Sequence, residues 1–239
     1  MRAWGIDGCR EGWFYVGIDG SRAEFGVVPV VKELADRVGD EALMMVDIPI
    51  GLPDEECGGR ACDTSARRIL SPSRSSSVFP VPARPAVYAD TYEAASELNR
   101  AALGKGLSKQ SWAICPKIRE VDRLLQERPD LRGRVREIHP EVCFWGLTGH
   151  PMRHSKKTRE GARERLDALA KVLPSARVRV AEAFLEYGGY EADRDDIIDA
   201  LVAAVCALEI ENCRTLPEER ETDATGLAME MVYWPAQAS

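Results

Sequence analysis

The feature that most constrains this chain is a late segment that predicts a helix buried on every side. In residues 196–209, apolar side chains recur with helical spacing at Ile197, Leu201, Ala204, Val205 and Leu208. Such a helix belongs in a core, yet its first turns carry Asp196 and Asp199, three residues apart on one face. Asp195 or Asp196 is its predicted N-cap. Two buried carboxylates repel each other and lose hydration, so they need a cation between them or a proton on one.

Two early segments supply further carboxylates. Residues 3–8 and 43–51 are apolar enough for strands buried on both faces of an α/β sheet, and they carry Asp7 and Asp47 near their carboxyl ends. Ligand sites in such sheets gather at the carboxyl ends of strands, so we expect these aspartates to meet the helix pair. Four carboxylates suit Mg²⁺ or Mn²⁺, which prefer oxygen ligands. The predicted metal ligands are Asp7, Asp47, Asp196 and Asp199.

The order of the predicted elements indicates an α/β fold with a mixed five-stranded sheet and helices on both of its faces. The predicted strands are residues 2–7, 12–18, 23–30, 43–48 and 134–140. The first three should form an antiparallel meander, because Asp19-Gly20 is a strong hairpin signal. A helix over residues 32–38 then leads to the fourth strand, which should pair in parallel with the first. The fifth strand should lie beside the fourth.

The rest of the chain is predicted to be mostly helical. Predicted helices cover residues 62–70, 91–103, 111–128, 155–173 and 196–209, with Pro116 marking a start or a kink. Three further segments are residues 141–147 (short helix or turn), 177–187 (helix or strand) and 228–233 (strand of period two). Gly, Pro and Ser are frequent between about 52 and 106. We therefore expect one domain over residues 1–239, with an insertion of loops and helices at about 52–106.

Composition narrows the classes of function. A net charge of −7 and a pI near 5.2 disfavour broad non-specific binding to nucleic acid, although they leave room for a local basic groove. Seven scattered cysteines favour reduced thiols over disulfides, and only Cys57 and Cys62 have the spacing of half a zinc site. No apolar run of about 18 residues predicts a membrane span. No secretory signal is visible, so a cytoplasmic location is expected.

A third polar group lies around the end of the fifth predicted strand. It consists of Glu137, His139 and Glu141, and it should lie near Asp47 on the neighbouring strand. Either glutamate can join a metal shell, and the imidazole can act as an acid, a base or a phosphate contact. The alternative is a strand-end cluster that makes only structural hydrogen bonds.

Basic residues are the candidate contacts for substrate phosphates. They are Arg67, Lys117, Arg119, Lys156 and Lys157, with Arg60 and Arg84 as further candidates. Lys156 and Lys157 open a predicted helix, where the helix dipole disfavours positive charge and a bound anion would relieve the conflict. The alternative for each side chain is a solvated cation without a ligand.

Eight short motifs are spread over residues 5–201. They are Gly5-Ile6-Asp7-Gly8, Asp47-Ile48-Pro49-Ile50-Gly51, Arg60-x-Cys62-Asp63, Ser76-Ser77-Val78-Phe79-Pro80, Pro116-Lys117-Ile118-Arg119, Glu137-x-His139-Pro140-Glu141, Ser155-Lys156-Lys157-Thr158 and Asp195-Asp196-x-x-Asp199-Ala200. Each is weak alone, but together and in this order the chain resembles the family known as domain of unknown function 429. That family is described as predicted ribonuclease H-like nucleases, so the resemblance implies a ribonuclease H-like fold.

The resemblance also implies roles for the acidic residues. Asp7 corresponds to the strand-one aspartate that bridges two metal ions in ribonuclease H-like nucleases, and Asp47 corresponds to the acidic residue that ends the fourth strand. Asp196 and Asp199 resemble the late-helix pair of Holliday-junction resolvases. The resemblance therefore implies that these four residues are both catalytic and metal-binding.

The expected function is hydrolysis of phosphodiester bonds in nucleic acid by two divalent ions about 3.5–4 Å apart. Glu33 and Asp36 match the usual glutamate after the third strand poorly, which favours a resolvase-like enzyme over ribonuclease H proper. One alternative is a non-catalytic scaffold for nucleic acid or protein with a degenerate site. A sugar-kinase or actin-like phosphotransferase is less favoured, because 239 residues leave no room for its second domain. A homodimer is the commonest oligomeric state and the default expectation.

Overall fold

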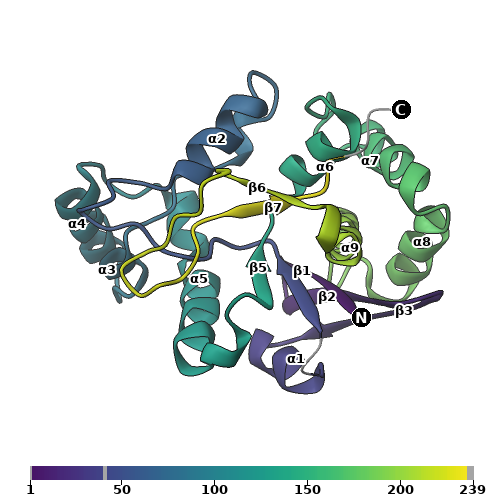
Figure 1. Cartoon of the computed structure of the whole chain (residues 1–239), viewed down its shortest axis with the longest axis horizontal. Coiled ribbons are helices and arrows are strands. Elements are labelled where there is room, and N and C mark those ends of the chain that lie inside the picture. Colours follow the sequence, from purple (N-terminus) through teal and green to yellow (C-terminus); the bar gives the residue numbers. More distant parts are fainter. Residues whose placement is uncertain (1, 40–41, 236–239) are drawn as a thin grey trace.

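The centre of the molecule is a five-stranded mixed sheet in the order β3-β2-β1-β4-β5 (Figure 1). The computed structural model describes residues 2–39 and 42–235. Its strands are β1 (Ala3–Cys9), β2 (Gly12–Asp19), β3 (Arg22–Val28), β4 (Leu43–Val46) and β5 (Val135–Glu137). The meander β1-β2-β3 is antiparallel, whereas β1, β4 and β5 run parallel, so the predicted sheet and its neighbours are confirmed. This α/β topology is consistent with a ribonuclease H-like fold.

Helices cover both faces of this sheet. The helices and short 3-10 turns are α1 (Val31–Arg37), α2 (Ala61–Ile69), η1 (Ser75–Ser77), α3 (Arg84–Val87), α4 (Tyr92–Leu103), α5 (Lys109–Glu127), η2 (Pro129–Leu131), α6 (Pro140–Thr148), α7 (Arg159–Val172), α8 (Ala176–Tyr187), α9 (Arg194–Leu208) and η3 (Ile210–Asn212). Successive residues of β2 point to opposite faces. Phe14 and Val16 join a core with α6 to α9, whereas Trp13 and Tyr15 join a second core with α1 and α5. The sheet therefore separates two apolar layers.

Several helix boundaries differ from the sequence predictions. Pro116 lies inside α5 rather than at its start. The helix predicted from residue 155 begins at Arg159, because Thr158 is its N-cap and accepts a backbone N–H bond with its hydroxyl oxygen. For residues 141–147 and 177–187 the sequence allows more than one type of element. In the structure, these residues belong to the helices α6 and α8. The turn that carries the paired lysines therefore lies outside α7.

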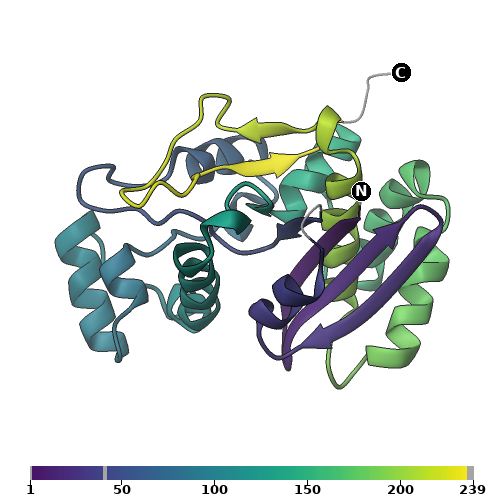
Figure 2. The same cartoon turned by 60° about the horizontal axis from the view of Figure 1, so that its bottom comes forward.

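The late strand belongs to a separate two-stranded sheet. Of the predicted strand over 228–233, only Met231–Tyr233 forms a strand, β7. It pairs antiparallel with β6 (Arg214–Leu216), which the sequence does not predict because three residues are too few to show a period. Figure 2 shows this hairpin beside α2 and α6. A single bridge from Val232 to Ile138 connects it to the segment that follows β5.

Neither disulfides nor helices of membrane-spanning length and hydropathy occur in the described residues. All seven cysteines are unpaired. The Cys62 thiol is buried and its Sγ lies 2.9 Å from Arg60 Nη2, whereas Cys57 is exposed. The half zinc site that their spacing suggested is therefore divided between a core position and a surface loop.

The helix α9 packs closely against β1 at Gly5. A Cβ atom on Gly5 would lie 2.0 Å from the backbone oxygen of Ala200 and 2.2 Å from the backbone nitrogen of Ala204. Only glycine fits on the strand, and the facing helix positions are alanines, so the backbone of α9 rests directly on β1. Asp199, which precedes Ala200, is consequently held near the end of the strand that carries Asp7.

We predict that Gly5→Ala lowers the free energy of unfolding by ~3 kcal/mol or more. The added methyl group overlaps backbone atoms of α9, which cannot move away as a flexible side chain can. Urea denaturation measures the loss. Gly39→Ala is the matched control, since no heavy atom lies within 4 Å of a Cβ placed there, and it should cause no loss. Equal denaturation midpoints for the two variants would contradict the proposed contact.

Candidate metal centre

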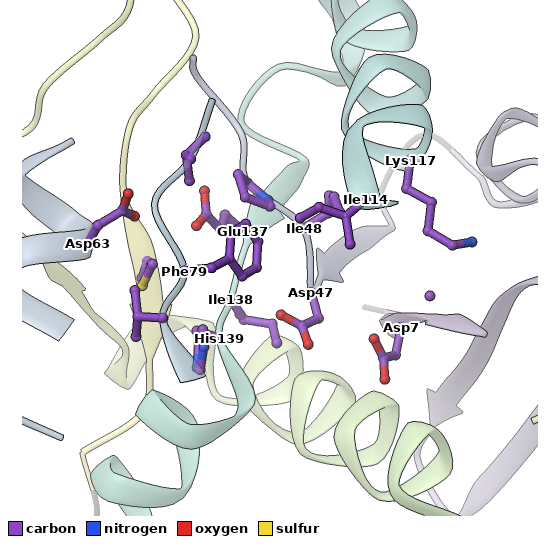
Figure 3. A pocket seen from close by; sticks show the side chains of 15 residues that line it. Asp7, Asp47, Ile48, Asp63, Phe79, Ile114, Lys117, Glu137, Ile138 and His139 are labelled. Atoms are coloured by element: carbon purple, nitrogen blue, oxygen red, sulfur yellow. The ribbon is translucent and has the colours of Figure 1, made fainter. Parts of the chain in front are cut away.

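The carboxyl ends of β1 and β4 place two aspartates side by side. Ile6 pairs with Val46 in the parallel register, and the backbone N–H of Asp47 donates to the Ile6 carbonyl oxygen at 2.9 Å. Asp7 and Asp47 directly follow these two paired residues, so they are neighbours, as the sequence predicts. Both line the same cavity (Figure 3), and Asp7 is only 7% exposed.

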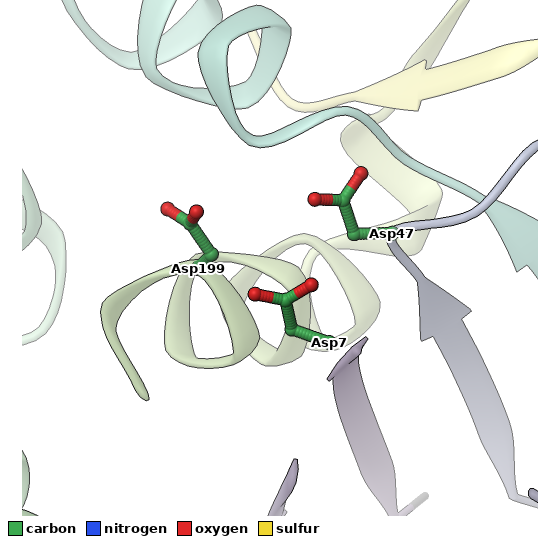
Figure 4. Close-up of side chains that lie close together, drawn as sticks. All are labelled: Asp7, Asp47 and Asp199. Carbon is green, nitrogen blue, oxygen red and sulfur yellow. The ribbon is translucent and has the colours of Figure 1, made fainter. Parts of the chain in front are cut away.

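The helix α9 adds a third carboxylate. One oxygen from each of Asp7, Asp47 and Asp199 lies within 4.8 Å of the other two. Figure 4 shows the three side chains pointing into a common space above α9. Asp199 is fully buried, and its Oδ1 has no hydrogen-bond partner among the residues that the structure describes. A buried carboxylate oxygen without a hydrogen bond or a cation destabilises the folded state. A bound ligand at this atom would remove that cost.

Burial dominates the electrostatics of the three carboxylates. It raises the pKa of Asp7 well above the usual range, and repulsion from Asp47 adds to the effect. It also raises the pKa of Asp47, to about 7, although attraction to Lys156 opposes it. The pKa of Asp199 rises for the same reason. The cluster therefore resists full ionisation until a cation compensates its charge.

Two lysines on the turn before α7 provide part of that compensation. Lys156 Nζ lies 2.5 Å from Asp199 Oδ2 and 3.6 Å from a carboxylate oxygen of Asp195. Lys157 Nζ lies 2.9 Å from Asp195. The anion that we expected beside this lysine pair is therefore supplied by carboxylates of α9. Asp195 is a residue of the site that the sequence prediction misses, although its place four residues before Asp199 puts both on one face of the helix.

Asp196 has a different position from the other predicted ligands. The N-cap of α9 is Asp193, so the expectation of Asp195 or Asp196 at that position is wrong. Asp196 instead accepts the backbone N–H of Asp193 at 2.9 Å. It lies outside the group of three converging oxygens, although its negative charge adds to the repulsion on Asp7. Burial raises the pKa of Asp196 itself to about 6.

The two predicted glutamates have arginine partners. Glu137 lies 2.6 Å from Arg60 Nη2 and accepts the backbone N–H of Ile50 at 2.7 Å. Glu141 pairs with Arg165, which is itself almost fully buried. Neither glutamate belongs to the group of converging oxygens. These ion pairs anchor β5 and α6 to their surroundings.

His139 stands at the N-cap of α6 and lines the same cavity as Asp7. Its Nε2 lies 3.4 Å from the carbonyl oxygen of Ser77, and its Nδ1 has no hydrogen-bond partner in the described part of the chain. A carbonyl oxygen only accepts hydrogen bonds, so this contact places the proton on Nε2 and leaves a free lone pair on Nδ1. Burial lowers the pKa of His139, which keeps the imidazole neutral near pH 7.

The predicted phosphate-binding residues fall into two groups. Arg119 donates to the carbonyl oxygens of Val87 and Ala89, and Arg67 donates to that of Val78, so these arginines bind loops of their own chain. Arg60 and Arg84 likewise pair with buried carboxylates. Lys117 lies at the cavity, where its Nζ donates to the carbonyl oxygen of Gly12 and lies 4.4 Å from the centre of the Trp13 ring.

The cavity that holds Asp7 and Asp47 has a volume of about 220 Å³. Its polar wall contains these aspartates together with Asp63, Lys117 and His139. Its apolar wall includes Ile48, Phe79 and Ile114 (Figure 3). An acidic end beside an apolar chamber is the arrangement of a binding cleft in which a few polar groups orient the ligand.

The donor set fits a hard divalent cation. The three converging atoms are carboxylate oxygens, which Mg²⁺ and Mn²⁺ prefer. The buried, unpartnered Asp199 Oδ1 is the ligand atom that a cation would satisfy. Asp7, Asp47 and Asp199 are therefore the residues that can hold the ion.

We predict that Asp47→Asn stabilises the metal-free protein more at pH 7.5 than at pH 5. A carboxyl whose pKa is raised on folding binds its proton more tightly in the folded state. Its contribution to stability is therefore present at low pH and is lost between the usual value of about 3.9 and about 7. Urea denaturation in EDTA measures the difference, with Asp19→Asn on the exposed end of β2 as the control. A stability gain independent of pH would contradict the shift.

Comparison with known proteins identifies the family of the chain. Residues 5–222 match the family model described as protein of unknown function (DUF429). No curated protein matches the chain, and no solved structure matches it. The matched region contains Asp7, Asp47, His139, Lys156 and Asp199, and thus every residue at the centre of the site. Because the match covers most of its length, the chain belongs to the DUF429 family.

Proposed function

We propose that this protein hydrolyses phosphodiester bonds in nucleic acid with the help of a divalent cation, Mg²⁺ or Mn²⁺. The observation that carries the proposal is the convergence of Asp7, Asp47 and Asp199, with one oxygen of each within 4.8 Å of the others, beside the buried and unpartnered Oδ1 of Asp199. The three residues come from two strand ends and one helix that are far apart in sequence. Such convergence at the carboxyl ends of parallel strands is typical of a ligand site.

The protein's part in the reaction is to bind, orient and accept a proton. Asp7, Asp47 and Asp199 would hold the cation, which when bound supplies positive charge to the phosphate. Lys117 stands at the edge of the cavity, where its ammonium group can meet a phosphate oxygen. The apolar chamber beside Phe79 can receive the base or sugar next to the scissile phosphate.

His139 is the proposed proton acceptor. In the hydrolysis, a water oxygen forms a bond to phosphorus while the bond from phosphorus to the leaving sugar oxygen breaks. The water proton passes to the free Nδ1 of His139, and the leaving oxygen takes a proton from solvent. The bond from Nε2 to the Ser77 carbonyl oxygen orients the imidazole for this role.

A resolvase-like site describes this arrangement better than ribonuclease H proper. The third cluster carboxylate comes from the late helix α9. The acidic residues of α1 lie elsewhere: Asp36 is exposed and pairs with Lys32 and Arg128. The proposal therefore extends to branched or single-stranded nucleic acid as the first substrates to examine.

We predict that Asp7→Asn and Asp47→Asn each abolish cation-dependent cleavage while the fold is retained, because each removes one of three converging ligands. The measurement is cleavage of labelled single-stranded and double-stranded DNA, RNA, RNA–DNA hybrid and a four-way junction in Mn²⁺. Asp19→Asn is the matched control, because Asp19 pairs with Arg2 at an exposed site.

The same assay separates proton transfer from cation binding. His139→Ala should retain Mn²⁺ binding but slow cleavage by about 100-fold or more, the usual contribution of a general base. His150→Ala, at an exposed position, should match the wild type.

Cleavage by Asp47→Asn at the wild-type rate, or no cleavage of any substrate by the wild type, would contradict the proposed function.

A further inference from the structure

We infer that Lys156 occupies the place of a second cation, so that the centre takes one divalent ion and a lysine ammonium group rather than two ions. The inference rests on the proposed function and specifies how its site is built. The observation behind it is the contact of 2.5 Å between Lys156 Nζ and Asp199 Oδ2. That oxygen belongs to the one cluster carboxylate that comes from α9.

The two oxygens of Asp199 have different surroundings. Oδ2 is bound by the ammonium group, whereas Oδ1 is buried without a partner. Oδ1 is therefore the Asp199 oxygen that is free to bind one ion together with oxygens of Asp7 and Asp47. A second ion held by Asp199 would need Oδ2, and Lys156 already holds that atom.

The balance of charges also predicts one divalent ion. The three carboxylates carry three negative charges when ionised, and Lys156 contributes one positive charge. One divalent ion balances the two remaining negative charges. A second ion would leave the centre with two positive charges in a poorly hydrated site, where uncompensated charge is costly.

The turn that carries Lys156 is held in place by side chains. Arg74 donates to the carbonyl oxygens of Met152 and Arg153 at 3.0 and 2.8 Å. Glu164 accepts the backbone N–H groups of Arg153 and His154, both at 2.9 Å. These bonds fix the chain just before the lysine, so its ammonium group reaches the carboxylates from a positioned backbone.

Lys157 provides the contrast within the same turn. Its side chain is 61% exposed, against 35% for Lys156, and it pairs with Asp195 and Asp193 at the start of α9. Within the described residues, Lys157 forms no ion pair with Asp7, Asp47 or Asp199. The two adjacent lysines therefore have separate roles, and only the first belongs to the centre.

An ammonium group at this position can bind a phosphate and stabilise negative charge on it, which are two of the effects that a second ion would have. It has three N–H donors, of which Asp199 takes one, so the others can bind a phosphate oxygen. Its positive charge stabilises negative charge that develops on the phosphate during hydrolysis. It does not coordinate ligands, so the remaining ion must still bind to Asp7 and Asp47.

The test is the number of Mn²⁺ ions bound per chain, measured by calorimetry and by electron paramagnetic resonance without substrate. The wild type should bind one ion, and Lys156→Ala should bind two, because Asp199 Oδ2 is released. Lys156→Arg keeps the charge and should bind one. Lys157→Ala is the matched control and should also bind one.

Each other outcome overturns the inference. Two ions in the wild type, or one ion in Lys156→Ala, would show that the lysine does not hold the second place, and the proposed function would stand. Binding by Lys156→Ala alone would show that the lysine blocks the centre. No binding by wild type, Lys156→Ala or Lys156→Arg would overturn both the inference and the metal centre. If Lys156→Ala does not fold, a wild-type count of two ions still overturns the inference.

Discussion

The structure depends on the direct contact between the backbone of α9 and the strand β1 at Gly5. A Cβ there would overlap the backbone of Ala200, so the contact exists only because the strand has a glycine and the helix has alanines. The same contact holds Asp199 beside Asp7, while the pairing of β4 with β1 adds Asp47. Packing in the core therefore sets the geometry of the acidic cluster, and a site built on rigid elements keeps that geometry.

Charge in this cluster is balanced by residues from separate parts of the chain. Burial raises the pKa of Asp7, Asp47 and Asp199, while Lys156 opposes the rise. The nearby Glu137 and Glu141 are paired with Arg60 and Arg165 and do not add ligands to the centre. Asp199 combines both situations, because its Oδ2 pairs with Lys156 while its buried Oδ1 has no hydrogen-bond partner in the described residues.

Most of the fold and the core of the site follow from local patterns. Apolar strands that carry Asp7 and Asp47 near their ends, and an apolar helix with Asp199, predict the sheet, its parallel neighbours and the cluster. The partners of Lys156, Glu137 and Glu141 depend on contacts between distant segments, which periodicity does not encode. The strand β6 is too short to show a period of two. Sequence alone does not select Asp193 as the N-cap of α9, because two further aspartates follow it closely.

The most direct measurement of the central claim is anomalous diffraction from crystals grown with Mn²⁺. The account predicts an anomalous peak within coordination distance of carboxylate oxygens of Asp7, Asp47 and Asp199, with Oδ1 as the Asp199 ligand. Peaks only at surface carboxylates, or no peak in crystals that diffract well at saturating Mn²⁺, would contradict the claim that these three residues form a cation site.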